Sequence, residues 1–167
     1  IHGASQSMLR MVTELLDVAT IESGEMQIDP AKHNLAELIE KSVYLANIEA
    51  AKKNTRISFA VPEVPPYPSI DSAKIQQVVD NLLSNAAKYS PPGSSITVEL
   101  RRDSDVCIFG VKDQGPGIPE NERDKLFKDF GRLSVKPTGG EKSTGLGLAI
   151  CRKIVEAHRG TILAENL

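Results

Sequence analysis

The sequence lacks several features that mark particular classes of function. Its 167 residues include no tryptophan, and aromatic residues make up only 4% of the chain. Proteins that hold single-stranded nucleic acid commonly stack the bases on aromatic side chains, so this scarcity argues against such a surface. The formal net charge of −2 also lacks the basic excess of a nucleic-acid-binding domain. We therefore expect no nucleic acid among the partners of this chain.

Cysteines and long apolar runs are scarce as well. Cys107 and Cys151 each stand alone in an apolar stretch, without the closely spaced partner that a metal site needs, so we expect reduced thiols in a cytoplasmic protein. No apolar run approaches the length of about 20 residues that spans a bilayer, so we expect no membrane contact by this chain. Because the chain begins at Ile1 within a helical pattern, we expect it to be part of a longer protein, which can itself be membrane-anchored.

The patterning of apolar residues predicts both helices and strands. Spacings of three and four residues predict helices over 5–23, 34–52, 71–89, 120–127 and 147–158. Alternation and turn signals predict strands over 25–29, 56–60, 95–102, 105–112 and 161–165. The proline-rich stretch 61–69 and the glycine-containing stretch 131–144 read as loops. Because helices and strands do not alternate regularly, we expect an α+β fold built as a two-layer sandwich.

The first predicted helix has an apolar stripe that is broad for a helix projecting alone from a domain. The stripe comprises Met8, Met11, Val12, Leu15, Leu16, Val18 and Ala19. Such a helix needs a second helix or a second chain to cover it. We therefore divide the chain into a helical segment over 1–27 and a compact domain over 28–167.

Three further segments carry side chains or glycines suited to a nucleotide. In the helix predicted over 71–89, Asn81, Asn85 and Lys88 share one face, which suits phosphates and a divalent ion, although a solvated helix face has the same composition. Asp113-Gln-Gly-Pro-Gly-Ile118 follows a strand, where the carboxylate can accept a hydrogen bond from an exocyclic amine or simply close a turn.

The third segment is Gly145-Leu-Gly147-Leu148, which opens the last predicted helix. Its backbone N–H groups and the helix dipole favour an anion. The segment is neither a three-glycine dinucleotide fingerprint nor a P-loop, because no Gly-Lys-Ser/Thr follows.

In this order the segments resemble the nucleotide-binding motifs of the GHKL superfamily, which includes gyrase-type topoisomerases, heat-shock chaperones of ninety kilodaltons, MutL proteins and sensor histidine kinases. Residues 81–89 resemble the N box, 113–118 the first glycine box and 145–150 the second, while 127–132 resemble the F box of histidine kinases. The resemblance implies the Bergerat ATP-binding fold, with a mixed sheet of about five strands and about three helices, preceded here by one amphipathic helix.

The resemblance also implies ATP and Mg²⁺ as cofactors and assigns roles to individual residues. Asn85 would bind the metal, Asn81 and Lys88 would contact phosphates or metal-bound water, and Asp113 would select adenine. Loop 131–144 would form a lid over the nucleotide. The remaining nucleotide contacts implied are Tyr89, Gly115, Gly117, Ile118, Arg132, Lys136, Lys142, Thr144, Gly145, Leu146, Gly147 and Leu148.

Two features favour a kinase over an ATPase. GHKL members that hydrolyse ATP have a glutamate as general base where this chain has Asn81, whose amide cannot take a proton. The first helix resembles the end of the second helix of a histidine kinase dimerisation bundle. The phospho-accepting histidine of that bundle is not present, since His2, His33 and His158 lack its acidic and proline neighbours.

The resemblance therefore implies transfer of the γ-phosphoryl group to a histidine elsewhere in the parent protein. The implied partners are ATP or ADP, the protein's own dimerisation and phosphotransfer domain, a response regulator receiver domain and a second copy in a homodimer. A GHKL-type ATPase and a non-catalytic nucleotide-binding interaction module remain as alternatives. An anti-sigma factor of the serine kinase type shares much of the pocket but lacks the amino-terminal helix.

Overall fold

The computed structural model describes residues 8, 12, 13, 16, 19, 20, 23, 24, 26–131, 133–141 and 144–166. Its elements, in chain order, are β1 (Ala31–Lys32), α2 (Leu35–Ala50), η1 (Ala51–Lys53), β2 (Arg56–Phe59), β3 (Ser69–Ile70), α3 (Ser72–Tyr89), β4 (Ser95–Asp103), β5 (Val106–Lys112), η2 (Glu120–Lys125) and α4 (Gly147–Ala157), where η denotes a 3₁₀ helix.

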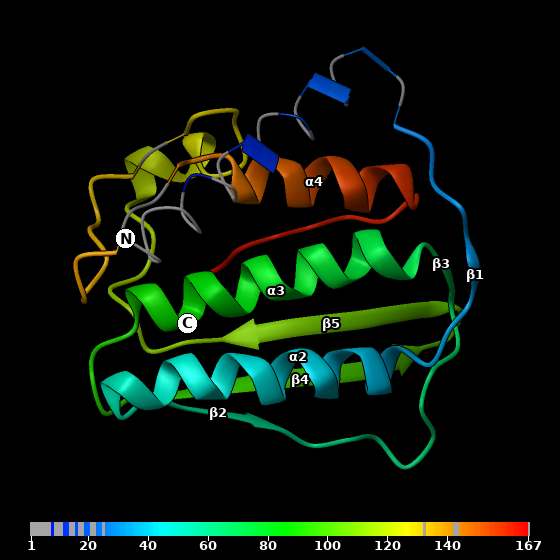
Figure 1. Ribbon diagram of the computed structural model, residues 1–167, viewed down its shortest axis with the longest axis horizontal. Helices are drawn as coiled ribbons and strands as arrows, with labels where there is room; N and C mark the ends of the chain where they lie inside the picture. The colour runs from blue at the N-terminus through cyan, green and yellow to red at the C-terminus, as the bar shows by residue number, and fades with distance from the viewer. Residues whose placement is uncertain are drawn as a thin grey trace.

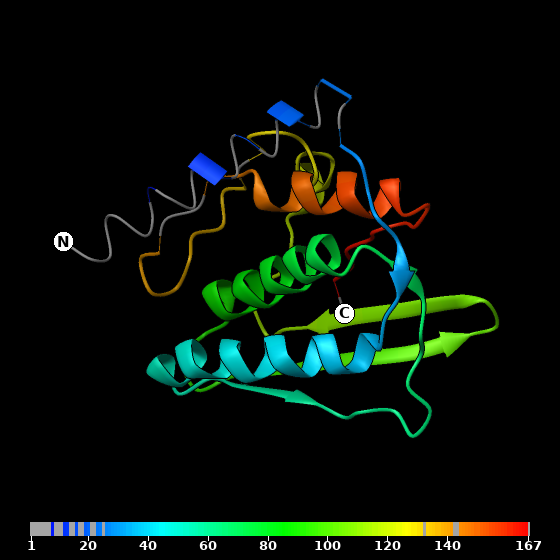
Figure 2. The same cartoon turned by 45° about the vertical axis from the view of Figure 1, so that its right-hand side comes forward.

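Helices cover one face of a three-stranded sheet. The strand order is β2-β4-β5, with β2 parallel and β5 antiparallel to the central strand β4. Helices α2 and α3 lie side by side over this sheet, and α4 lies against the side of α3 that faces away from α2 (Figures 1 and 2). The short strands β1 and β3 pair with each other at the edge of this arrangement. The result is an α+β sandwich in whose helical layer α3 lies between α2 and α4.

Local sequence explains where these elements begin and which way they face. Asn34 caps α2, because its Oδ1 accepts hydrogen bonds from the backbone N–H groups of the two residues Ala36 and Glu37. Asp71 caps α3 in the same way through the N–H of Lys74. In β4, alternate residues point into the helical layer, and these residues are Ile96, Val98 and Leu100.

The buried apolar side chains form two clusters, and α3 contributes to both. The larger cluster fills the space between α2, α3 and the sheet, and it includes Ile39, Leu83 and Ile96, each fully buried. The smaller cluster lies between α3 and α4 and includes Val78 and Ile150. Helix α3 is therefore fixed on two sides by apolar packing, which leaves a third side for polar residues.

Most of the predicted elements agree with the structure. The helices expected over 34–52, 71–89 and 147–158 are present with ends shifted by one or two residues, as are the strand at 56–60 and the hairpin. The strands form two sheets rather than one. The helix expected over 5–23 falls largely outside the described residues, although residues 8, 12, 13, 16, 19 and 20 are helical.

Three expectations about elements were wrong. The strand expected over 25–29 is instead β1, because pairing with β3 selects Ala31 and Lys32. Residues 161–165 form no strand, since no described backbone pairs with them and a strand is defined by its ladder. The helix expected over 120–127 is the 3₁₀ helix η2, whose six residues are all polar and offer no apolar face to pack.

No described helix is both long enough and apolar enough to cross a bilayer.

Two isoleucines of α2 test the assignment of the core. Ile39 is fully buried, whereas Ile48 on the same helix is 55% exposed. We expect Ile39→Ala to lower the free energy of unfolding by about 2–5 kcal/mol, because it leaves a cavity between helix and sheet. Ile48→Ala should change it by less than about 1 kcal/mol. Urea unfolding followed by circular dichroism measures both, and equal losses would contradict the orientation of α2.

Candidate functional site

The polar face of α3 lies beside the start of α4. Asn81, Asn85 and Lys88 are all half-buried on α3. A Cβ atom added to Gly147 would lie 3.4 Å from Oδ1 of Asn81, an ordinary van der Waals contact, so the start of α4 lies directly beside this amide. The structure thus brings together the predicted N box and the predicted second glycine box, which are far apart in the sequence.

The start of α4 presents its backbone toward this polar face. Gly145 adopts a φ of +79°, a left-handed conformation that favours glycine. The next residue, Leu146, is 1% exposed and anchors the turn in the smaller apolar cluster, while its N–H donates to Oγ1 of Thr144 over 3.4 Å. Among the described residues, no side chain caps α4. Its first-turn N–H groups therefore suit an anion, and Gly147 and Leu148 belong to this turn.

The predicted first glycine box lies against the end of α3. Asp113 is exposed, and its Oδ1 accepts a 2.7 Å hydrogen bond from the N–H of Gly115, which closes a tight turn. A Cβ on Gly115 would lie 3.2 Å from the backbone oxygen of Tyr89, the last residue of α3. The turn therefore places Asp113 next to the N box. Its second carboxylate oxygen, Oδ2, does not take part in the hydrogen bond that closes the turn.

Asn166 is a positioning residue that the sequence reasoning missed. Its side-chain amide accepts from the N–H of Ile118 and donates to the oxygen of Ile118, both over 2.8 Å. Gly117, with a φ of +74°, allows this approach, because a Cβ there would lie 2.9 Å from Oδ1 of Asn166. The chain after α4 thus holds the first glycine box through one side chain. The strand pattern predicted for 161–165 did not indicate this contact.

The predicted lid is fastened to the rest of the domain at two places. Near its start, the carboxylate of Glu122 accepts hydrogen bonds from the N–H and the hydroxyl of Ser134, over 2.8 and 3.1 Å. These bonds, the backbone one foremost, lower the pKa of Glu122. Further along, the N–H of Thr138 donates to the backbone oxygen of Lys88 over 2.9 Å. Lys136 is exposed, and Arg132 and Lys142 lie outside the described residues.

The segment that resembles the F box also contacts α4. Both carboxylate oxygens of Asp129 lie 3.1 Å from Nζ of Lys153 on α4. This ion pair connects the chain before the predicted lid with the helix after it.

The buried thiol beside Asn81 is kept neutral. Burial raises the pKa of Cys151 to about 12, against a smaller opposing effect of a hydrogen bond with Asn81. No cluster of three or more acidic, histidine or cysteine side chains that could hold a metal occurs among the described residues. A metal at this site would therefore be held by amide oxygens and by a ligand bound at the same site.

These contacts define a class of protein. Four segments that are distant in the sequence meet around the second half of α3: the helix's own polar face, an uncapped glycine-rich helix start, an Asp-Gly turn and a loop that crosses the helix end. This is an α+β domain in which a polar helix face, the start of a second helix and two loops lie together. A family model described as histidine kinase-, DNA gyrase B- and HSP90-like ATPase matches residues 70–166, and the chain belongs to this family.

Known proteins narrow the comparison to sensor histidine kinases. The adaptive-response sensory kinase SasA of Synechococcus sp. (strain JA-3-3Ab) is 37% identical over 171 residues, covering 99% of this chain and 44% of SasA. The structure of the mycobacterial sensor histidine kinase MprB is 31% identical with a TM-score of 0.67, over 78% of this chain and 82% of MprB. The chain spans less than half the length of the curated relatives it matches.

A third comparison includes a partner protein. The histidine kinase ThkA, solved in complex with the response regulator protein TrrA, is 26% identical to this chain with a TM-score of 0.71. The match covers 93% of this chain and 43% of that one. As a member of this family, the chain is the catalytic, nucleotide-binding type of domain found in sensor histidine kinases.

The protonation state of Cys151 gives a chemical test of this geometry. With a pKa of about 12, only about one thiol in 10⁴ is ionised at pH 8, and the thiol is buried between α3 and α4. We expect iodoacetamide at pH 8 to alkylate Cys151 at least about 100-fold more slowly in the folded chain than in urea. Mass spectrometry of the peptides measures both rates. Rapid labelling in the folded state would show that α4 does not close over Asn81 as described.

Proposed function

We propose that this domain binds Mg²⁺–ATP and presents the γ-phosphoryl group to a histidine on another part of a sensor histidine kinase. The observation that carries the proposal is the meeting of the Asn81 side of α3 with the uncapped start of α4 at Gly147. Amides and an ammonium group on one side, and free helix N–H groups on the other, suit a chain of phosphates.

The metal in this proposal is held mainly by the amide of Asn85. Mg²⁺ prefers hard oxygen ligands, keeps several waters and is commonly bound through one or two protein groups together with phosphates. The half-buried Asn85 amide fits that demand, and no acidic cluster among the described residues offers a competing site. When bound, the metal would neutralise phosphate charge, while Asn81 and Lys88 would orient the phosphates or the metal's waters.

The other proposed contacts follow the geometry of the loops. Asp113 would accept from the exocyclic amine of adenine, since its carboxylate stands at the mouth of the turn beside Tyr89. The proposed pocket floor comprises Gly115, Gly117 and Ile118, and the proposed phosphate contacts beyond α3 comprise Thr144, Gly145, Leu146, Gly147 and Leu148. From the lid, Arg132, Lys136 and Lys142 are candidate phosphate contacts.

The environment of Asp80 supports a kinase rather than an ATPase. A water-activating base would have to be a carboxylate near Asn81, and Asp80 is the neighbouring one. Its Oδ1 accepts a 2.7 Å hydrogen bond from the hydroxyl of Ser42 on α2 and another from Gln76. Asp80 thus lies toward α2, away from the face that carries Asn81. The site holds ATP without its own base, and the acceptor histidine would supply the nucleophile.

The imidazole of His158 has a structural role, which supports an acceptor elsewhere. In His158, Nε2 accepts from the backbone N–H of Asp71 over 3.0 Å, and Nδ1 lies 2.8 Å from the backbone oxygen of Ile154. Both ring nitrogens are therefore used. His33 donates its backbone N–H to Pro68, and His2 lies outside the described residues.

The parent protein in this proposal is a two-component kinase. Residues 1–27 would complete the dimerisation and phosphotransfer bundle, and residues 28–167 would form the ATP-binding domain. The apolar side chains of Met8, Val12 and Leu16 are exposed, which supports a helix whose apolar stripe is covered by another helix or chain in the parent protein. The proposed partners are that bundle, a second copy in a homodimer and a response regulator receiver domain, of the kind that accompanies ThkA. The domain would work in the cytoplasm, on a parent that is soluble or membrane-anchored.

Two substitutions test nucleotide binding. We expect Asn85→Ala and Asp113→Ala each to weaken Mg²⁺–ATP binding by about ten- to a hundredfold, because each removes a hydrogen bond or metal ligand of the bound nucleotide. The matched control is Asp105→Ala, whose carboxylate is fully exposed at the far end of the β4–β5 hairpin. Isothermal titration calorimetry measures all three. Unchanged affinity in both site variants would refute the proposed pocket.

A labelling experiment tests whether the ATP-binding domain and the acceptor histidine lie in different parts of the parent protein. Incubated with γ-labelled ATP and Mg²⁺, this chain should remain unlabelled, since none of its histidines resembles an acceptor. Supplying the parent protein's bundle as a separate chain should restore label on that bundle. Acid-labile phosphate on His2, His33 or His158 would overturn the assignment, and steady release of phosphate without an acceptor would favour the ATPase.

A further inference from the structure

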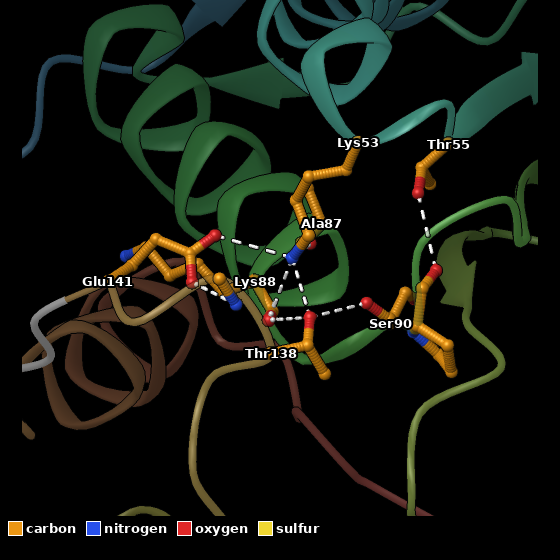
Figure 3. A network of polar contacts seen from close by, with 9 residues as sticks. Lys53, Thr55, Ala87, Lys88, Ser90, Thr138 and Glu141 are labelled. Carbon is orange, nitrogen blue, oxygen red and sulfur yellow. Dashed lines mark hydrogen bonds and ion pairs between the residues drawn. The ribbon is translucent and has the colours of Figure 1, made fainter.

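The ammonium group of Lys53 lies where three segments of the domain meet. Lys53 ends η1, directly after α2, and its Nζ lies 2.9 Å from the backbone oxygen of Ala87 and 3.2 Å from that of Lys88. On its other side Nζ lies 2.6 Å from Oγ1 of Thr138 and 3.3 Å from Oε1 of Glu141 (Figure 3). Its side chain is only 17% exposed, so this charge is held within the domain rather than in solvent.

The ammonium group of Lys53 contacts carbonyl groups at the end of α3. The last carbonyl groups of a helix have no partner within the helix, and a cation there is favoured by the helix dipole. Lys53 supplies that cation to α3, and an ammonium group has three N–H donors, enough for the helix end, the threonine and the glutamate. Burial opposes ionisation of Glu141, but hydrogen bonds from its own N–H, Lys53 and Gly139 outweigh it and lower its pKa.

Thr138 links the ammonium group to the helix end. Its hydroxyl accepts from Lys53, lies 2.7 Å from the backbone oxygen of Ser90, to which it donates, and also lies 3.0 Å from that of Lys88. Its backbone N–H donates to the oxygen of Lys88 as well. The lid is thus tied, through one threonine and one lysine, to the backbone of the same residue whose side chain is a candidate phosphate contact.

From this geometry we infer that Lys53 is a positioning residue for the lid, fixing the segment Thr138–Glu141 against the end of α3 before nucleotide arrives. Lys53 touches neither the predicted metal ligand nor the predicted adenine contact, and it acts through Thr138, Glu141 and the carbonyl of Lys88. A lid that is ordered in advance loses less conformational entropy when it closes on phosphates, so the bound state is favoured. The inference rests on the proposed function, since it concerns the affinity for ATP.

Removing the charge while keeping the length of the side chain isolates this role. We expect Lys53→Met to weaken Mg²⁺–ATP binding about tenfold, the effect of losing one hydrogen bond to a charged group. Binding of adenosine should be unchanged, because it has no phosphates for the lid to meet. Hydrogen exchange at the amides of Thr138 and Gly139 should accelerate about tenfold or more, since both donate to groups that Lys53 holds.

Lys52→Met is the matched control. Lys52 is the adjacent residue, carries the same charge, is 67% exposed and pairs at the surface with Glu49. It should leave affinity and exchange at wild-type values. Lys53→Arg, which keeps the charge, should recover most of the ATP affinity, and Thr138→Val should reproduce the loss without altering any charge. Thermal unfolding confirms that each variant is folded.

The outcomes separate this inference from the proposed function. If the wild-type chain binds no adenine nucleotide, the proposed function fails. If it binds ATP and Lys53→Met matches Lys52→Met in affinity and in exchange, the positioning role of Lys53 is refuted while the proposed function stands. If Lys53→Met loses ATP and adenosine binding equally, Lys53 contributes to stability alone and the positioning role is refuted. The role is also refuted if Lys53→Met is unfolded while Thr138→Val binds ATP normally.

Discussion

Burial of α3 on two sides is the constraint on which the rest of the site depends. Leu83 packs into the cluster above the sheet, and Val78 packs into the cluster beneath α4. Successive residues of a helix are rotated by about 100°, so two apolar contacts fix the rotation of the whole helix. Asn81, Asn85 and Lys88 then form a stripe that borders the side facing α4. The apolar contacts thus set the direction in which these polar residues point.

The same packing explains why small residues are needed where α4 begins. Leu146 is buried in the cluster that joins the two helices, so the following residue is forced close to Asn81. At Gly147 a Cβ would already be in van der Waals contact with that amide, and a larger side chain would fill the gap between the polar stripe and the free N–H groups. The approach of the start of α4 to Asn81 is thus a consequence of how α3 and α4 pack.

The features predicted correctly from sequence are those that depend on near neighbours. Helix periodicity located α2, α3 and α4, and the predicted start at residue 34 falls on Asn34, the cap of α2. The face shared by Asn81 and Lys88 followed from helical spacing alone. The features missed depend on distant partners: β1 exists because β3 pairs with it, and residues 161–165 form no strand because no described strand pairs with them. Asn166 holds the loop at Ile118 through a contact between residues 48 positions apart, which no local pattern encodes.

The chemistry of the contacts divides the domain into a fixed part and an adjustable part. Apolar burial holds α3, and losing it costs several kcal/mol per side chain, of order 2–5 for a large residue. The lid is held instead by polar groups, Glu122 with Ser134 and Lys53 with Thr138, and such bonds contribute about 0.5–3 kcal/mol each because water competes for them. Local opening therefore concentrates in the lid, while the stripe on α3 stays in place. The proposed binding of ATP would need both properties, and two different kinds of interaction meet at the end of one helix to provide them.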